Sequence, residues 1–155
     1  IINLQASGFY KIKDSIIYKV LSDIKIPGRF QKLFDDPIII FDPAHNYDAL
    51  KNLLEGLNIF YKDKKILLVI SMMKDKADKK TIDLFKKSHV IYYLLNDERA
   101  YIPDNQFFKL IISNNDLIFD IINENRNNNF MILFTGTFRI FKHALSVVDN
   151  LKEIQ

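Results

Sequence analysis

The sequence contains no cysteine, which excludes a disulfide framework, a thiolate zinc site and a cysteine nucleophile. No apolar run approaches about 18 residues, so no transmembrane helix is expected. Residues 1–7 are not a charged segment leading into an apolar stretch, so no signal peptide is predicted. We therefore expect a cytoplasmic protein without a membrane partner. Because the chain begins at Ile1 and not at methionine, we also expect it to be a piece of a longer protein.

Glycine and proline are scarce, with four residues of each, so every position they occupy is informative. Three glycine-dependent motifs are missing: the phosphate-binding loop G-x-x-x-x-G-K-[ST], the dinucleotide fingerprint G-x-G-x-x-G and the hydrolase motif G-x-S-x-G. The chain thus has no motif of its own for holding a triphosphate or a dinucleotide, and it is not a hydrolase of that type.

What remains is the composition of one folded domain. Of the 155 residues, 48% are hydrophobic and 26% are charged. A chain of this length buries roughly 70% of the surface that its unfolded form exposes. The formal charge of +3 comes from lysines spread along the chain, and the clusters at 62–65 and 79–80 lie beside acidic residues, which is typical of a solvated surface. We therefore expect no nucleic-acid partner, which would need basic residues interleaved with exposed aromatics on one face.

The hydrophobic pattern predicts strands that alternate with helices. Apolar residues at helical spacing predict helices over 14–21, 48–60, 76–87, 115–125 and 138–151. Short apolar runs predict strands over 30–34, 38–41, 66–71, 90–95, 108–112 and 130–134. Uninterrupted apolar runs are typical of strands buried on both faces. The expected fold is α/β, a Rossmann-like three-layer sandwich whose mostly parallel sheet carries residues 30–34 as an antiparallel edge strand.

This topology predicts where a ligand binds, because open α/β sheets bind ligands outside the carboxyl ends of their strands. The segments expected at that edge are residues 42–46, 72–76, 96–99 and 135–137. Loops are polar in any protein, so this convergence supports a functional site only weakly by itself.

Residues 42–46 read Asp-Pro-Ala-His-Asn and are the richest of these segments. Asp42 can accept hydrogen bonds from ribose hydroxyls or position a cation, and His45 can donate to a phosphate or carboxylate oxygen. Asn46 can cap the following helix. Alternatively, Asp42 and Asn46 only form the turn. No metal site is predicted, because the three histidines lack ligand spacing.

Three further side chains are candidates, each with a structural alternative. Arg29 follows a Pro-Gly pair and can clamp a phosphate or carboxylate bidentately, or it is a surface residue after a turn. A lysine of the segment Lys74-Asp75-Lys76 can pair with a substrate carboxylate, or the segment is a charged helix N-terminus. Thr137 opens the last helix beside Gly136, where N–H groups suit an anion, or it is an N-cap.

Together and in order, these motifs resemble a known family, the C-terminal domain of folylpolyglutamate synthase/dihydrofolate synthase in the Mur ligase superfamily. The resemblance runs from about Asp14 to the end, and its motifs read Ile-Pro-Gly-Arg-Phe-Gln (26–31), Asp-Pro-Ala-His-Asn (42–46), Met-Met-Lys-Asp-Lys (72–76) and Thr-Gly-Thr (135–137). It implies that residues 1–25 are the terminal helix and linker of a preceding ATPase domain, and that residues 26–155 are the Mur ligase C-terminal-like domain. This sequence departs from the family pattern at Gln31, Pro43, Tyr47, Ala77 and Thr137, where the family has Glu, Gly, Pro, Asp and Ser.

The resemblance implies an ATP-dependent ligase that adds L-glutamate to dihydropteroate or to folates through an acyl phosphate. The phosphate-binding loop and most of the ATP and magnesium site would belong to the protein's own N-terminal ATPase domain, so this piece alone would be inactive. By resemblance, Arg29 reaches the ATP phosphates, Asp42 holds the ribose and His45 lies beside the nucleotide. Lys76 and Thr137 receive the glutamate, and Arg29, His45 and Lys76 form the catalytic set.

Two other functions are open at this point. One is a different Mur-type ligase that acts on a peptide precursor. The other is a non-enzymatic signalling module, such as a phospho-accepting receiver domain. That fold needs an acidic pair at the end of its first parallel strand, where this sequence supplies only Asp42.

Overall fold

The computed structural model of the protein describes residues 13–24, 26–85, 89–104, 108, 110–124 and 129–153. The strands are β1 (Gln31–Asp35), β2 (Ile38–Phe41), β3 (Lys65–Ile70), β4 (His89–Tyr93), β5 (Leu110–Ile112) and β6 (Phe130–Thr135). The helices are α2 (Asp14–Asp23), α3 (Tyr47–Phe60), α4 (Lys79–Asp83), α5 (Asn115–Glu124) and α6 (Phe141–Glu153), with short 3-10 turns η1 (Lys74–Lys76) and η2 (Phe138–Ile140).

Six strands form a single sheet in the order β1-β2-β6-β3-β4-β5. β1 pairs antiparallel with β2, and the other neighbouring strands are parallel. Phe41 of β2 lies opposite Phe134 of β6, and Ile70 of β3 lies opposite Thr135, so these three strands end at the same level. The predicted parallel sheet with an antiparallel edge strand is confirmed, and the central strands open onto one common edge.

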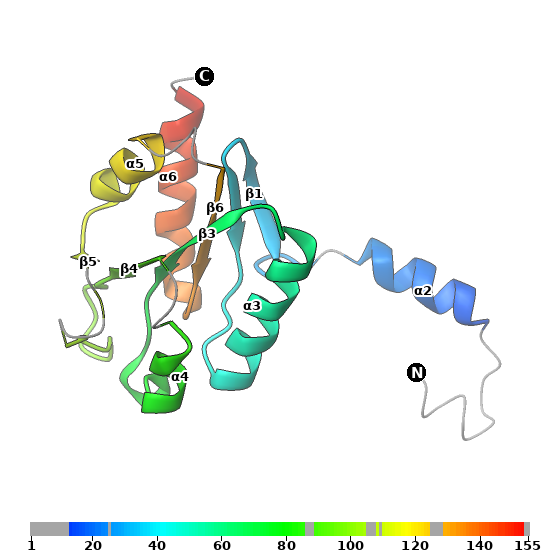
Figure 1. The fold of residues 1–155 in the computed structure, drawn as a ribbon, viewed down its shortest axis with the longest axis horizontal. Helices are drawn as coiled ribbons and strands as arrows, with labels where there is room; N and C mark the ends of the chain where they lie inside the picture. Colours follow the sequence, from blue (N-terminus) through cyan, green and yellow to red (C-terminus); the bar gives the residue numbers. More distant parts are fainter. Residues whose placement is uncertain are drawn as a thin grey trace.

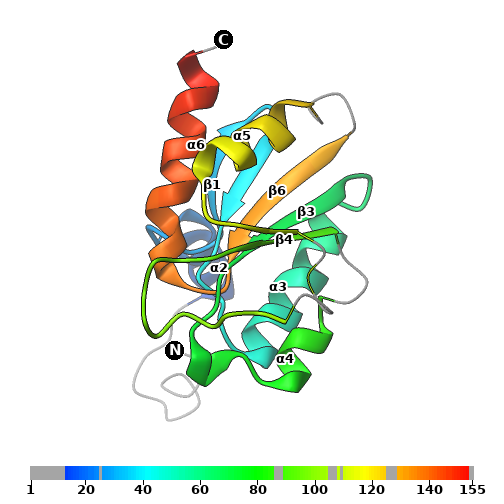
Figure 2. The same cartoon turned by 90° about the vertical axis from the view of Figure 1, so that its left-hand side faces the viewer.

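Helices cover both faces of the sheet, as Figures 1 and 2 show. One core lies between the sheet and helices α3 and α4, with Leu50, Leu57 and Ile82 nearly or fully buried. The other lies beneath α5 and α6, where Ile118 and Val147 have no exposed surface. Side chains of alternating strand residues point to opposite faces, so each buried strand supplies both cores. The three-layer architecture is confirmed.

The prediction of one helix over 76–87 is wrong. The chain makes the 3-10 turn η1, leaves helical geometry at Ala77, and begins α4 only after Asp78, whose side chain accepts the Thr81 N–H at 2.8 Å. An aspartate that caps a helix has extended backbone itself, which separates the two turns. The predicted end of this helix at 86–87 lies outside the described residues, as does residue 109 of the strand predicted over 108–112.

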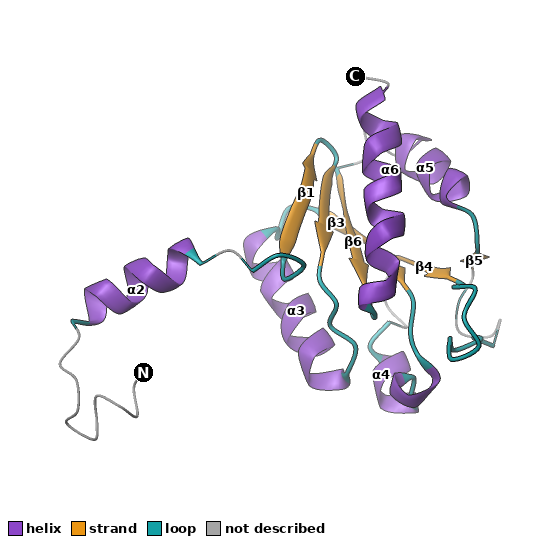
Figure 3. Cartoon of the chain, turned by 180° about the vertical axis from the view of Figure 1, so that it is seen from behind, coloured by secondary structure: helices purple, strands orange, loops and turns teal. Residues whose placement is uncertain are grey.

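Helix α2 lies apart from the sheet and its covering helices in Figures 1 and 3. Its apolar residues Ile16 and Val20 are each more than half exposed. Among the residues that the structure describes, these two side chains of the amphipathic pattern are therefore largely uncovered. None of the helices that the structure describes is long and apolar enough to cross a bilayer.

Candidate functional site

A pocket of about 340 Å³ lies where β2, β6 and β3 end, within the size range of small-molecule sites. The loops after these three strands and the turn before β1 form its walls. Its lining consists of Arg29, Pro43, His45, Met73, Asp75, Lys76, Gly136, Thr137 and Phe138. Four of the five side chains predicted as site residues therefore line one pocket, although they come from four separate segments of the sequence.

Asp42, the fifth predicted residue, lies beside the pocket and organises its backbone. Its Oδ1 accepts the N–H of Ala44 at 2.9 Å, and its Oδ2 accepts the N–H of Phe30 at 2.8 Å. The Asp42 N–H donates to Phe134 O at 3.0 Å, continuing the ladder between β2 and β6. The carboxylate thus joins the end of β2 to the turn that carries Arg29, which is a turn-forming role of the kind considered as the alternative.

The turn before β1 presents Arg29 as an exposed cation at the rim of the pocket. Gly28 has a φ of +72°, and a Cβ there would lie 2.6 Å from the Phe138 ring, so both backbone conformation and space favour glycine. The Gly28 N–H donates to Gln31 Oε1 at 2.7 Å. An amide oxygen accepts this bond as a carboxylate oxygen would, so glutamine at position 31 keeps the turn closed.

His45 is exposed, and one of its ring nitrogens is already engaged. Nδ1 lies 2.9 Å from the carbonyl oxygen of Pro43. Because a carbonyl can only accept, Nδ1 carries the hydrogen, and Nε2 of the neutral ring is an acceptor. His45 therefore offers a second donor to an anion only as the imidazolium ion. Asn46 caps α3 by accepting the Ala49 N–H at 2.9 Å, which confirms its predicted role.

Lys76 lies at the end of η1, and its Nζ forms an ion pair with Asp75 Oδ2 at 3.0 Å. This hydrogen bond lowers the pKa of the Asp75 carboxyl from its ordinary value. The two side chains are 42% and 69% exposed, so solvent screens the pair and Lys76 can exchange Asp75 for another carboxylate at little cost.

Thr137 is buried and N-caps η2, its Oγ1 accepting the Arg139 N–H at 3.4 Å. The preceding Gly136 has a φ of +95° and donates its N–H to Ala44 O at 2.9 Å. A Cβ at Gly136 would lie 2.3 Å from Ser71 O, so only glycine fits between β6 and β3 here. The cap proposed as the structural alternative is present, and the hydroxyl hydrogen of Thr137 can still be donated to an anion.

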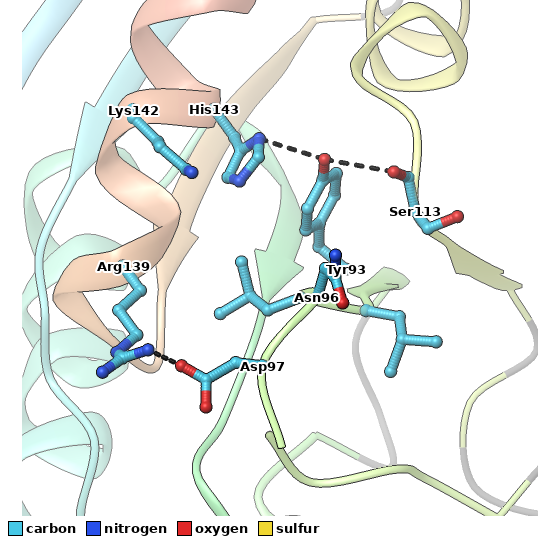
Figure 4. Close-up of a pocket in the computed structure, with 9 residues that line it drawn as sticks. Tyr93, Asn96, Asp97, Ser113, Arg139, Lys142 and His143 are labelled. Atoms are coloured by element: carbon cyan, nitrogen blue, oxygen red, sulfur yellow. Dashed lines mark hydrogen bonds and ion pairs between the residues drawn. The ribbon is translucent and has the colours of Figure 1, made fainter. Parts of the chain in front are cut away.

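A second pocket, of about 400 Å³, lies farther along the same edge between β4, β5 and α6 (Figure 4). Several of its polar groups are paired with one another. Asp97 forms an ion pair with Arg139, and the Tyr93 hydroxyl lies 2.9 Å from Asn115 Oδ1 and 3.0 Å from His143 Nδ1. Burial raises the pKa of Tyr93 and, with the nearby Lys142 charge, lowers that of His143. Although this pocket is larger, the pocket at Arg29 brings together four of the five predicted site residues and is therefore the candidate site.

The sequence did not single out every residue at this edge. Phe138 lines the candidate pocket with 57% of its surface exposed, and only its place after Thr137 could have indicated it. The Asp97–Arg139 pair joins residues distant in the sequence, so no local pattern reveals it. Within the described ranges, no three His, Asp or Glu side chains are grouped so that they could hold a metal ion.

Comparisons with known proteins find similar sequences and similar folds. Residues 28–103 match the family model of the Mur ligase glutamate ligase domain. The chain is 29% identical over 148 residues to a dihydrofolate synthase/folylpolyglutamate synthase of Buchnera aphidicola subsp. Schizaphis graminum, covering 90% of this chain and 34% of that protein. It is 36% identical over 73 residues to the corresponding Escherichia coli K12 enzyme, covering 47% of this chain and 17% of that one. The chain thus spans about a third or less of the length of these relatives.

The fold is shared with solved structures of the same class. E. coli FolC in complex with ADP superposes with a TM-score of 0.76 at 24% identity, over 97% of this chain and 38% of that chain. A Mycobacterium tuberculosis folylpolyglutamate synthase gives a TM-score of 0.71 at 14% identity, over 96% and 37%. The sequence matches and the shared fold confirm the resemblance that the motifs predicted: residues 28–103 are similar to the Mur ligase glutamate ligase domain, and the chain is similar to part of the dihydrofolate synthase/folylpolyglutamate synthases.

Proposed function

We propose that this chain is the C-terminal domain of an ATP-dependent ligase that joins L-glutamate to dihydropteroate or to folates. One observation carries the proposal: two cationic side chains, Arg29 and Lys76, converge with His45 and Thr137 on one pocket of a chain that has no phosphate-binding loop. Such a domain needs a partner that holds the triphosphate. The relatives named above are about three times as long as this chain, which supports the proposal that a further domain holds the triphosphate.

The residues of the pocket suit the two half-reactions of such a ligase. ATP would supply the phosphoryl group that converts the substrate carboxylate into an acyl phosphate, with ADP as the leaving group. The permanently charged guanidinium of Arg29 is suited to phosphate oxygens, and His45 lies across the same pocket. Attack of the glutamate amino group on the acyl carbon then forms the amide, releases inorganic phosphate and gives up a proton. In this proposal, Lys76 and the Thr137 hydroxyl hold glutamate carboxylates during that attack.

We also propose that residues 1–25 form the last helix and the linker of a preceding ATPase domain, and that residues 26–155 form the closing domain. Ile16 and Val20 of α2 are exposed in this chain, and a neighbouring domain would cover them. The role of Asp42 follows from its contacts: it fixes the Arg29 turn, and its remaining lone pairs are available to a ribose hydroxyl. Closure over the pocket would exclude water from the hydrolysable acyl phosphate. By the same reasoning, this chain alone is inactive.

The test is glutamate-dependent phosphate release by the complete protein, with dihydropteroate and folates as alternative acceptors. Arg29→Ala should lower kcat/KM by about 100-fold or more while circular dichroism and melting temperature stay unchanged. Lys152→Ala, at an exposed position on α6, is the matched control and should retain activity.

The absence of glutamate-dependent turnover with every pterin substrate would overturn the proposal. Turnover with a peptide precursor in place of the pterins would assign the domain to a different Mur-type ligase. A wild-type rate for Arg29→Ala would remove that residue from the site.

A further inference from the structure

Residues 96–101, here called the Asp97 loop, follow β4 at the carboxyl edge of the sheet but do not line the candidate pocket. The Asp97 side chain is only 11% exposed, which is unusual for a carboxylate unless it is paired. Its Oδ1 accepts the Arg99 N–H at 2.9 Å, and the Arg99 Nε lies 3.5 Å from the same oxygen. The loop is therefore folded around this carboxylate.

On one side, the Asp97 loop is fastened to the segment that leads to Lys76. Ala100 forms an antiparallel bridge with Met73. Hydrogen bonds run from Lys74 N to Arg99 O at 2.9 Å, from Lys74 Nζ to Glu98 O at 2.6 Å, and from Tyr101 N to Met72 O at 2.9 Å.

The buried Tyr92 hydroxyl strengthens this attachment. It donates to Tyr101 O at 2.8 Å and accepts the Met72 N–H at 3.2 Å, so one side chain joins the two segments. Burial raises the pKa of Tyr92 to about 12, so the hydroxyl keeps its hydrogen at neutral pH. The path of the chain into η1 is thus held by the Asp97 loop.

On its other side, the loop is fastened to the turn that carries Thr137. Asp97 Oδ2 forms an ion pair with the Arg139 guanidinium, as Figure 4 shows. Arg139 in turn donates its backbone N–H to Thr137 Oγ1. Since η2 spans Phe138–Ile140, the ion pair holds the first turn after Thr137 against the end of β4.

We infer that Asp97 is a positioning residue for the incoming amino acid, because it fixes Lys76 and Thr137 relative to each other without touching the pocket. This inference rests on the proposed function, in which those two residues receive glutamate. The inference gives a role to a residue that follows β4, a strand whose end contributes no side chain to the candidate pocket. The ion pair with Arg139 is the link that a single substitution can remove.

The test is steady-state kinetics of Asp97→Asn in the complete protein. Asparagine keeps the size of the side chain and an oxygen for the Arg99 N–H, but it removes the charge that faces Arg139. The KM for glutamate should rise about tenfold, and the KM for ATP should stay within about twofold. Arg139→Gln should give the same pattern, and the double variant should be no worse than the more affected single variant. Asp149→Asn, which breaks an exposed ion pair with Lys152, is the control and should leave both KM values unchanged.

A second measurement does not depend on turnover. In ¹H–¹⁵N spectra of the complete protein, Asp97→Asn should shift the amide signals of both Lys76 and Thr137, whereas Asp149→Asn should shift neither. Unchanged signals at these two positions overturn the inference whatever the enzyme does. An unchanged glutamate KM, or an equal rise of every KM, in an active enzyme also overturns it. Shifted signals in a protein without glutamate-dependent turnover support the positioning link and reject the proposed ligase function.

Discussion

Two aspartates at the same edge of the sheet make the same local hydrogen bond with one carboxylate oxygen, but their second oxygens have different partners. Asp42 follows β2 and Asp97 follows β4, and each accepts the backbone N–H of the residue two positions on at 2.9 Å. The second oxygen of Asp42 accepts another backbone N–H, that of Phe30, whereas the second oxygen of Asp97 meets the Arg139 guanidinium.

The two carboxylates support the site in different ways, one by fixing backbone and the other by fixing a side chain. The Asp42 contact fixes the backbone of the Arg29 turn, where Phe30 has a φ of +41° that a non-glycine residue adopts only with support. The Asp97 contact fixes a side chain, and its loop has further hydrogen bonds to residues 72–74. Loss of Asp42 should therefore alter the chain path of the Arg29 turn, whereas loss of the Asp97 charge should let the Asp97 loop and η2 move relative to each other.

The largest effect should come from a substitution at Gly136, where the end of β6 passes close to the end of β3. Gly136→Ala places a Cβ 2.3 Å from Ser71 O at a φ of +95°, next to the N–H that bonds Ala44 O. We expect the free energy of unfolding to fall by about 3 kcal/mol or more, measured by urea denaturation. Gly56→Ala is the matched control: its Cβ meets nothing within 4 Å in helix α3, so it should stabilise the protein by up to about 1 kcal/mol. Equal effects of the two substitutions would contradict the close approach at Gly136.

Asp42→Asn should have the next largest effect. The amide has one acceptor oxygen, so either the Phe30 or the Ala44 N–H faces an NH₂ group and loses its partner. We expect a loss of about 2 kcal/mol in urea unfolding, since bonds to a charged acceptor are stronger than neutral ones. Asp48→Asn, on the exposed side of the first turn of α3, is the control for removing a carboxylate nearby and should cost less. A loss no greater than the control's would show that the Arg29 turn holds without Asp42.

The ion pair of Asp97 should contribute less to stability than the Asp42 contacts. In a double-mutant cycle with Asp97→Asn and Arg139→Gln, we expect a coupling free energy of about 1 kcal/mol. The Arg139 side chain is 45% exposed, so solvent screens the attraction, and added salt should reduce the coupling. A coupling free energy larger than the loss of unfolding free energy in Asp42→Asn would contradict the prediction that the Asp42 contacts contribute more to stability.

Much of the fold follows from periodicity, because each buried strand reads as an apolar run and each covering helix has one apolar face. The positions of Arg29, His45, Lys76 and Thr137 were predictable for a related reason: they follow strand ends, or precede β1, in a parallel sheet. Such positions are set by topology, and topology is visible in the order of elements.

The contacts that hold these residues were not predictable in the same way. The hydrogen bond from the Phe30 N–H to Asp42 depends on a positive φ at Phe30. Phenylalanine rarely adopts this backbone conformation, so the sequence does not predict it. The Asp97–Arg139 pair depends on where α6 begins relative to β4, a matter of tertiary packing. The single helix expected over 76–87 failed because Asp78 caps a new helix, which periodicity alone does not register.

The smallest expected effect is a pH dependence of the unfolding free energy that arises near Asp97. Near Asp97, the pocket in Figure 4 contains His143, whose pKa is lowered from its ordinary value of 6.5 by burial and then by the Lys142 charge. Because the unfolded chain binds the proton more readily, stability is full above about pH 6.5 and falls as the pH drops through the lower folded value. His143→Gln removes this loss, so the difference in unfolding free energy between wild type and variant should change between pH 7 and 5. We expect a change of a few tenths of a kcal/mol, since the half-buried ring is partly screened by solvent. A pH-independent difference in urea unfolding would mean that the proton on His143 is equally stable in the folded and unfolded chain.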